Sequence, residues 1–166
     1  MTSVVGFRRE GRLIMSHSLV KVYVHFVWTT KNRERILVGD TRRIVVDHIS
    51  ANAGERGIQV EALNVQPEHV HTLVKFAHDQ RIEDLAKLLK GESSHWINHS
   101  DILPGKFSWQ TGYAAFSVAY DRLDAVRQYV MKQDEHHWRK SFTEELNEML
   151  QDAGYAEAEI AGMLRL

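Results

Sequence analysis

The clearest pattern of hydrophobic and polar positions lies in residues 19–30, where Val24, Phe26 and Trp28 alternate with more polar neighbours. Side chains of a β-strand point in turn to opposite faces of its sheet, so this alternation predicts a strand. Runs rich in β-branched and aromatic residues, bounded by turn signals, predict three more strands. These are residues 58–66, residues 69–76 and a segment near residues 113–118.

Apolar residues recur at helical spacing in the segments between and after these strands. The spacing predicts helices over residues 40–56, 79–97 and 121–140, followed by short helices over residues 143–150 and 156–164. The resulting order, β-α-β-β-α-β followed by helices, is typical of the split βαβ, or ferredoxin-like, arrangement. We therefore expect an α+β fold with a four-stranded antiparallel sheet and additional C-terminal helices.

The chain of 166 residues has the size of one domain with appendages. We divide it into an N-terminal extension (residues 1–15), a main domain (residues 16–142) and an acidic helical tail (residues 143–166). The extension is either disordered or precedes a true start at Met15. It lacks the apolar stretch of a signal peptide, and no segment is apolar for long enough to span a membrane, so we expect a cytoplasmic protein without membrane contacts.

The charge of the chain is uneven. Lys and Arg number 21 and Asp and Glu number 22, which gives a net charge of -1. Six of the acids and one of the bases lie in residues 144–166, so the preceding residues carry a net charge of +4. A mildly basic body does not exclude a nucleic-acid partner. The absence of cysteine excludes thiolate metal sites and cysteine nucleophiles.

The sharpest local motif is His69-Val70-His71 on the third predicted strand. Side chains two apart on a strand share a face, so both imidazoles can reach one divalent ion. The alternative is a pair of stacked or solvent-facing histidines. A second pair, His95 and His99, lacks an evident third ligand, and we interpret it as a solvent or DNA contact.

A second motif lies on the third predicted helix, where Tyr129 and Gln133 are four residues apart and therefore share a helical face. The alternative is a half-buried tyrosine and a surface glutamine. Together with the histidine pair, however, Gln133 could complete a metal site and Tyr129 could attack a phosphate polarised by that metal. His136 and His137 follow on the same helix, and we expect them to contact phosphate or to shape the site.

Five segments in the same order resemble the single-tyrosine HUH transposases of small bacterial insertion sequences, which include TnpA-like and REP-associated tyrosine transposases. HUH denotes His-hydrophobic-His. The segments are residues 19–35, 68–74, 90–94, 107–118 and 129–137. The resemblance covers the chain from about residue 16 to residue 142 and implies a ferredoxin-like domain with an extra helix that carries the nucleophilic tyrosine.

The resemblance also implies an activity and a set of site residues. Tyr129 would be the catalytic nucleophile, forming a 5′-phosphotyrosine with single-stranded DNA beside hairpins at the ends of an element. His69, His71 and Gln133 would be the metal ligands, with magnesium or manganese as the cofactor. Members of the family are homodimers in which the tyrosine helix of one subunit can complete the histidine site of the other.

Three other hypotheses stay open. The chain could be a domesticated, REP-associated hairpin-binding nuclease, or a non-catalytic module that binds single-stranded nucleic acid. A small metal-dependent hydrolase is the least favoured, because alternation along the strand points Glu68 away from the histidine pair.

Overall fold

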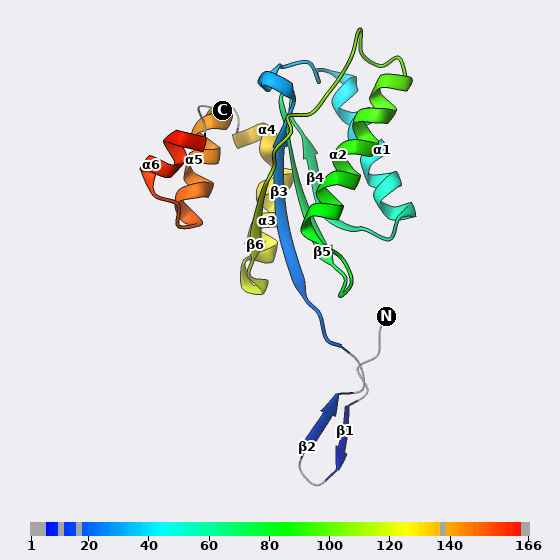
Figure 1. Cartoon of the computed structure of the whole chain (residues 1–166), viewed down its shortest axis with the longest axis vertical. Coiled ribbons are helices and arrows are strands. Elements are labelled where there is room, and N and C mark those ends of the chain that lie inside the picture. The colour runs from blue at the N-terminus through cyan, green and yellow to red at the C-terminus, as the bar shows by residue number, and fades with distance from the viewer. Residues whose placement is uncertain (1–5, 10–11, 16–17, 137–138, 164–166) are drawn as a thin grey trace.

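A computed structural model describes residues 6–9, 12–15, 18–136 and 139–163 (Figure 1). Four strands form the main sheet in the order β4-β5-β3-β6, with every neighbouring pair antiparallel. They are β3 (Val22–Thr29), β4 (Gln59–Val65), β5 (His69–Phe76) and β6 (Ala114–Val118). The predicted α+β, ferredoxin-like fold with a four-stranded antiparallel sheet is confirmed.

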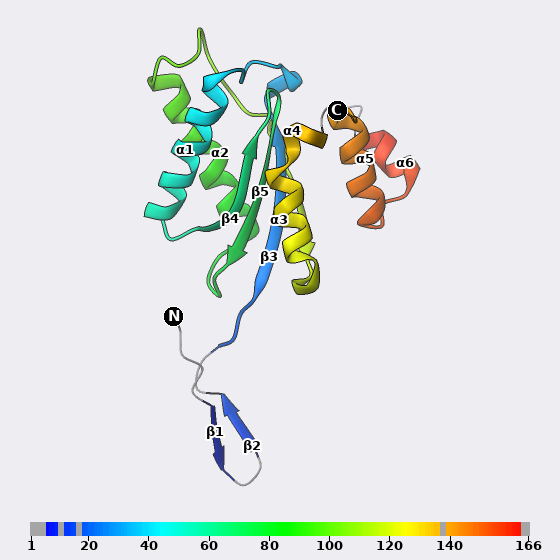
Figure 2. The same ribbon diagram turned by 180° about the vertical axis from the view of Figure 1, so that it is seen from behind.

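One face of the sheet is covered by α1 (Asp40–Glu55) and α2 (Ile82–His99), which lie side by side in Figures 1 and 2. Alternate strand residues and the inward stripes of the two helices make the main hydrophobic core there. Its buried members include Val24, Phe26 and Trp28 of β3, and Val45 and Leu85 of the two helices. The alternation read from residues 19–30 therefore orients β3 as expected.

The opposite face of the sheet receives α3 (Leu123–Met131), which packs on β4 and β5 (Figure 2). The apolar cluster on this side is small and contains Tyr23, Leu73, Leu123 and Val130. After α3 follow α4 (Gln133–His136), α5 (Phe142–Asp152) and α6 (Glu157–Met163). This second face also carries the histidines of β5.

The continuous helix predicted over residues 121–140 is wrong. A short 3-10 helix, η2 (Tyr120–Arg122), precedes α3. The helix ends at Met131, because the next residue, Lys132, has a φ of -99° and a ψ of 23°, outside the helical region. Tyr129 therefore belongs to α3 and Gln133 begins α4. After the break the chain runs toward the end of β4, where Asp134 of α4 accepts hydrogen bonds from Arg42 and Gln66.

Other elements lie outside the ferredoxin-like core. β1 (Gly6–Arg9) and β2 (Arg12–Met15) form a separate two-stranded sheet, which Figure 1 shows beyond one end of the main sheet. A 3-10 helix, η1 (Lys31–Arg33), follows β3. We expected His136 and His137 to contact phosphate or to shape the site, but the side chain of His136 and the whole of His137 lie outside the described part of the chain.

Candidate active site

The two histidines of the His-Val-His motif lie on β5 with side chains that are 0% exposed. Their rings meet edge to face with centroids 4.9 Å apart, on the face opposite Val70, which belongs to the main core. Strand alternation therefore places His69 and His71 together as predicted. They are buried, which excludes the alternative of a solvent-facing pair.

The Nδ1 atom of each imidazole lies close to a polar atom of another residue. Nδ1 of His71 lies 3.0 Å from Nε2 of His25, which is itself buried. Nδ1 of His69 lies 3.3 Å from a carboxylate oxygen of Glu68, and that carboxylate accepts a 2.8 Å hydrogen bond from Arg35. When the Nδ1 atom of a histidine is held by a partner, the metal ion is bound through Nε2.

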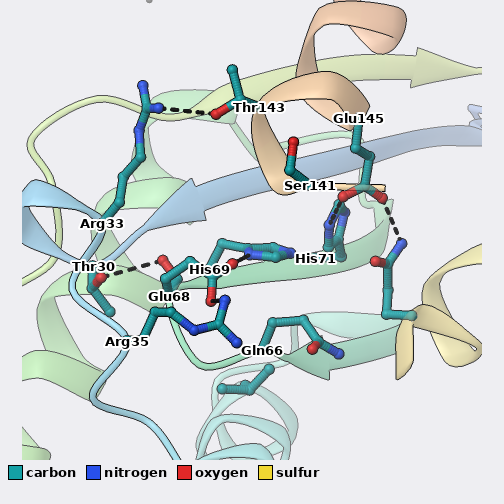
Figure 3. A network of polar contacts seen from close by, with 12 residues as sticks. Thr30, Arg33, Arg35, Gln66, Glu68, His69, His71, Ser141, Thr143 and Glu145 are labelled. Atoms are coloured by element: carbon teal, nitrogen blue, oxygen red, sulfur yellow. Dashed lines mark hydrogen bonds and ion pairs between the residues drawn. The ribbon is translucent and has the colours of Figure 1, made fainter. Parts of the chain in front are cut away.

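The position of Glu68 corrects a sequence-based expectation. We expected strand alternation to point its side chain away from the histidine pair, but β5 begins only at His69. Glu68 lies in the preceding turn, where its backbone carbonyl accepts a hydrogen bond from the Thr30 amide. Alternation does not govern a turn residue, and the carboxylate therefore lies beside His69 (Figure 3).

Tyr129 and Gln133 face the histidine pair despite the helix break between them. The ring of Tyr129 meets that of His71 edge to face at 5.9 Å, and the Gln133 side chain is 0% exposed. Asp134 fixes α4 beside the sheet, because its carboxylate accepts hydrogen bonds from Arg42 of α1 and from Gln66 at the end of β4. The four residues predicted from the sequence thus converge within one chain.

The acidic tail contributes a fifth residue, Glu145 of α5, which points toward His71 in Figure 3. Its carboxylate accepts hydrogen bonds from the Tyr129 hydroxyl and, at 2.9 Å, from the Gln133 amide nitrogen. Its second oxygen lies 3.6 Å from Nε2 of His71. The ring of Phe142, at the start of the same helix, stacks on His69 with centroids 4.2 Å apart.

Burial and charge shift the acidities of the groups in this site. Burial by itself would raise the pKa of Glu145, but the hydrogen bond and charge of His71, with the bonds from Tyr129 and Gln133, lower it to about 2. Burial, followed by the hydrogen bond to Glu145, raises the pKa of the Tyr129 phenol well above its ordinary value. The phenol therefore stays protonated at neutral pH in this arrangement.

These residues fit a divalent ion. Ligand atoms of His69, His71 and Glu145 all lie within 4.8 Å of one another. The Gln133 side-chain oxygen is buried and has no hydrogen-bond partner among the described residues. Imidazole nitrogens with carboxylate and amide oxygens are a donor set that suits manganese and accommodates magnesium.

Sequence reasoning missed His25 and Glu145, whereas the interpretation of His95 and His99 as a solvent or DNA contact stays a prediction. The latter two pack ring on ring at 4.2 Å on α2, and no third potential metal ligand joins them among the described residues. No signal of spacing or motif links the tail to the histidines. His25 alone carried a signal, because it sits on the polar side of the alternating strand.

Comparison with known proteins identifies the family. Residues 18–133 match the sequence model described as Transposase IS200 like. The ISDra2 transposase TnpA of Deinococcus radiodurans is 28% identical over 114 residues, which make up 66% of this chain and 81% of that protein. The crystal structure of a protein described as a transposase, from D. radiodurans R1, superposes on this chain with a TM-score of 0.58 at 27% identity. The superposition covers 76% of this chain and 98% of that one.

A second solved structure supports the fold alone. A REP-associated tyrosine transposase bound to a REP hairpin superposes with a TM-score of 0.55 at 16% identity, covering 79% of this chain and 78% of that one. In the part of the chain that the structure describes, no helix combines the length and apolar character that crossing a membrane requires. The family model spans well over half of the chain, and the resemblance drawn from its motifs is confirmed: this protein belongs to the family of IS200-like transposases.

Proposed function

We propose that this transposase cleaves and rejoins single-stranded DNA through a covalent bond to Tyr129. The observation that carries the proposal is the convergence of the Tyr129 hydroxyl, the Gln133 amide and the buried histidine pair in one site. Nucleophilic catalysis requires such a nucleophile beside groups that stabilise developing charge. Family membership makes DNA transposition the overall activity.

In the proposed step, the phenol oxygen of Tyr129 attacks a backbone phosphorus. The bond from phosphorus to the 3′ oxygen breaks, leaving a 5′-phosphotyrosine, and the phenol proton ends on the departing 3′ oxygen. Attack by that 3′-hydroxyl, or by another one, on the phosphotyrosine reverses the step and rejoins a strand. The phosphotyrosine bond conserves the energy of the broken phosphodiester bond. Rejoining therefore needs no polymerase and consumes no nucleotide.

His69, His71 and Gln133 are the proposed ligands of a magnesium or manganese ion, and Glu145 offers a further oxygen to the same ion. When bound, the ion supplies positive charge that polarises the phosphate and favours the phenolate. Such charge is needed because burial and the Glu145 carboxylate raise the pKa of the Tyr129 phenol. The chain's own residues orient the phenol and hold the ligand atoms away from water.

The test is formation of a protein–DNA adduct that resists denaturation, using a hairpin oligonucleotide with single-stranded flanks taken from palindromes beside the gene. We expect the adduct with Mn²⁺ or Mg²⁺, its loss with a chelator, and its loss in Tyr129→Phe. Tyr155→Phe is the matched control, because this tyrosine is 41% exposed between α5 and α6. No adduct from the wild type, or an undiminished one from Tyr129→Phe, contradicts the proposal.

A DNA hairpin is the proposed partner. The solved REP-associated tyrosine transposase is bound to a REP hairpin, and its fold is similar to that of this chain. A domesticated, hairpin-binding nuclease would cut repeats beside its own gene, whereas a mobile element would cut its own matched ends. A non-catalytic module would bind the hairpin equally well after His69→Ala and form no adduct.

Access to the site requires a movement of α5. His69, His71 and Gln133 are each 0% exposed, and Phe142 and Glu145 of α5 lie against them. A DNA phosphate can contact these ligands only after α5 has shifted. Amide hydrogens of α5 should therefore exchange faster when the hairpin oligonucleotide is added, and unchanged exchange would contradict this route of entry.

We also propose a homodimer, as in other members of the family. The described contacts join Tyr129 and His71 of one chain, and exchange of α3 between two chains would produce the same contacts. Mixing Tyr129→Phe chains with His69→Ala chains distinguishes the two arrangements. Recovered adduct in verified heterodimers indicates a shared site, and persistent inactivity indicates a site within each chain.

A further inference from the structure

His25 has a contact that the proposed reaction does not use. Its Nε2 atom lies 3.0 Å from Nδ1 of His71, and the two rings stack with centroids 5.2 Å apart. The strand register explains the contact, because His25 pairs with Leu73 and His71 pairs with Val27, so the two histidines are diagonal neighbours across β3 and β5. The His25 side chain is buried, with 5% of the residue exposed.

The chemistry of imidazole gives this contact a direction. A metal ligand must offer a lone pair, so a neutral His71 that binds through Nε2 carries its proton on Nδ1. The Nε2 atom is the one that faces Glu145, at 3.6 Å from a carboxylate oxygen, where the other ligand atoms gather. In this tautomer Nδ1–H of His71 donates to His25, and Nε2 of His25 accepts.

We propose that His25 is a positioning residue that holds His71 with its proton on Nδ1 and aims the Nε2 lone pair at the metal ion. The inference rests on the metal site proposed above. The buried His25 ring stacks on the His71 ring, so its Nε2 atom is held at hydrogen-bond distance from Nδ1 of His71.

The other ligand is held by a different kind of partner. Nδ1 of His69 lies beside the Glu68 carboxylate, which Arg35 pairs at 2.8 Å. A carboxylate adds negative charge behind its histidine, whereas the His25 imidazole accepts the hydrogen bond without adding charge. Among residues that orient a metal-bound histidine, an acceptor at the second nitrogen is the common feature, and its loss weakens metal affinity about 10- to 100-fold.

The test compares two replacements of His25 in the full-length protein. Gln carries a side-chain oxygen that can accept from Nδ1–H of His71, whereas Leu fills a similar volume without an acceptor. We expect His25→Leu to weaken Mn²⁺ binding about 10- to 100-fold by isothermal titration calorimetry, and His25→Gln to restore most of that loss. Equal affinity of wild type and His25→Leu, or equal losses in both variants, overturns the inference.

A readout without metal separates this inference from the proposed metal site. The ¹⁵N chemical shifts of His71 in the metal-free wild type should show a protonated Nδ1, and His25→Leu should shift the proton population toward Nε2. An unprotonated Nδ1 in the wild type overturns the inference, whether or not Mn²⁺ binds. Absence of Mn²⁺ binding by the wild type, with Nδ1 protonated, contradicts the metal site and leaves the role of His25 in orienting His71 supported.

His48→Leu is the matched control. His48 is a half-buried histidine on α1 that bonds the Glu92 carboxylate at 2.9 Å and stacks on Trp96, on the other side of the sheet. The substitution His48→Leu removes an imidazole that makes no contact with His69 or His71. We expect it to change neither the Mn²⁺ affinity nor the ¹⁵N shifts of His71, and an effect as large as that of His25→Leu would show that the readouts report general disturbance.

Discussion

Both faces of the sheet are covered by helices, but the side chains buried on them differ in chemistry. Between the sheet and the α1–α2 layer lie mainly aliphatic and aromatic side chains, with Phe26 and Val45 each 0% exposed. Against α3 and α5 lie imidazoles, an amide, a phenol and a carboxylate, around a small apolar cluster. Burial of polar groups is unfavourable unless they are paired, so the second face depends on specific contacts.

The difference indicates that one face mainly stabilises the fold and the other mainly carries the proposed chemistry. Apolar packing tolerates small adjustments and supplies most of the driving force for folding. The polar face requires each hydrogen bond to be made, and it holds the residues proposed to act on DNA. Substitutions on the first face should therefore change stability, whereas substitutions on the second should change metal binding, acid sensitivity or local order.

The largest expected change in stability comes from Phe26→Ala on the apolar face. Phe26 is 0% exposed within the main core, and removing its ring leaves a cavity. The free energy of unfolding should fall by about 3–5 kcal/mol. Urea denaturation measures it, with Val22→Ala as the control at a strand position that is 47% exposed. A loss below about 1 kcal/mol would contradict the assignment of this face as the main core.

Acid should act on the polar face. The pKa of Glu145 is lowered to about 2 in the folded chain, so its charge stabilises the fold above its ordinary pKa of 4.5. That stabilisation is lost as the pH falls from 4.5 toward 2. Between these limits the wild type should lose about 1–3 kcal/mol more than Glu145→Gln in urea denaturation. Parallel pH profiles of the two proteins would show that the Glu145 contacts do not stabilise the fold.

A smaller change in the free energy of unfolding is expected from a buried charged residue of the α1–α2 layer. Lys90 of α2 is 8% exposed, and its ammonium donates to the backbone carbonyls of Gln110, Thr111 and Gly112. Lys90→Met should lower the free energy of unfolding by about 1–2 kcal/mol, because these carbonyls lose their donor. The exposed Lys87 of the same helix provides the control, Lys87→Met, for which we expect no measurable change.

The smallest expected effect is local to α5. Ser141 caps this helix and forms a capping box with Glu144. Ser141→Ala should weaken the helix by about 1 kcal/mol and speed amide hydrogen exchange in α5 by several-fold, without altering exchange in β5. Equal acceleration in β5 would mean that the tail and the sheet open together, and no acceleration in α5 would show that the cap is dispensable.

Local patterns were sufficient to predict the four strands of the main sheet and the first two helices. Alternation places Val24 and Phe26 in the core and His69 with His71 on the other face, because strand geometry is repeated at every second residue. The break at Lys132 could not be predicted in this way. Contacts of Asp134 with Arg42 and Gln66, far away in the sequence, outweigh the helical tendency of residues 121–140.

The sequence by itself determined the order of the four strands of the main sheet and of the two helices between them. It also determined the four side chains proposed for the reaction, because both depend on short spacings that repeat or match a motif. Only the tertiary structure decided which further side chains contact these four residues. His25 lies 46 positions from His71, and Glu145 lies 16 positions from Tyr129 across a turn and a broken helix. No local periodicity relates such positions, since their meeting depends on strand register and on how α5 packs against the sheet.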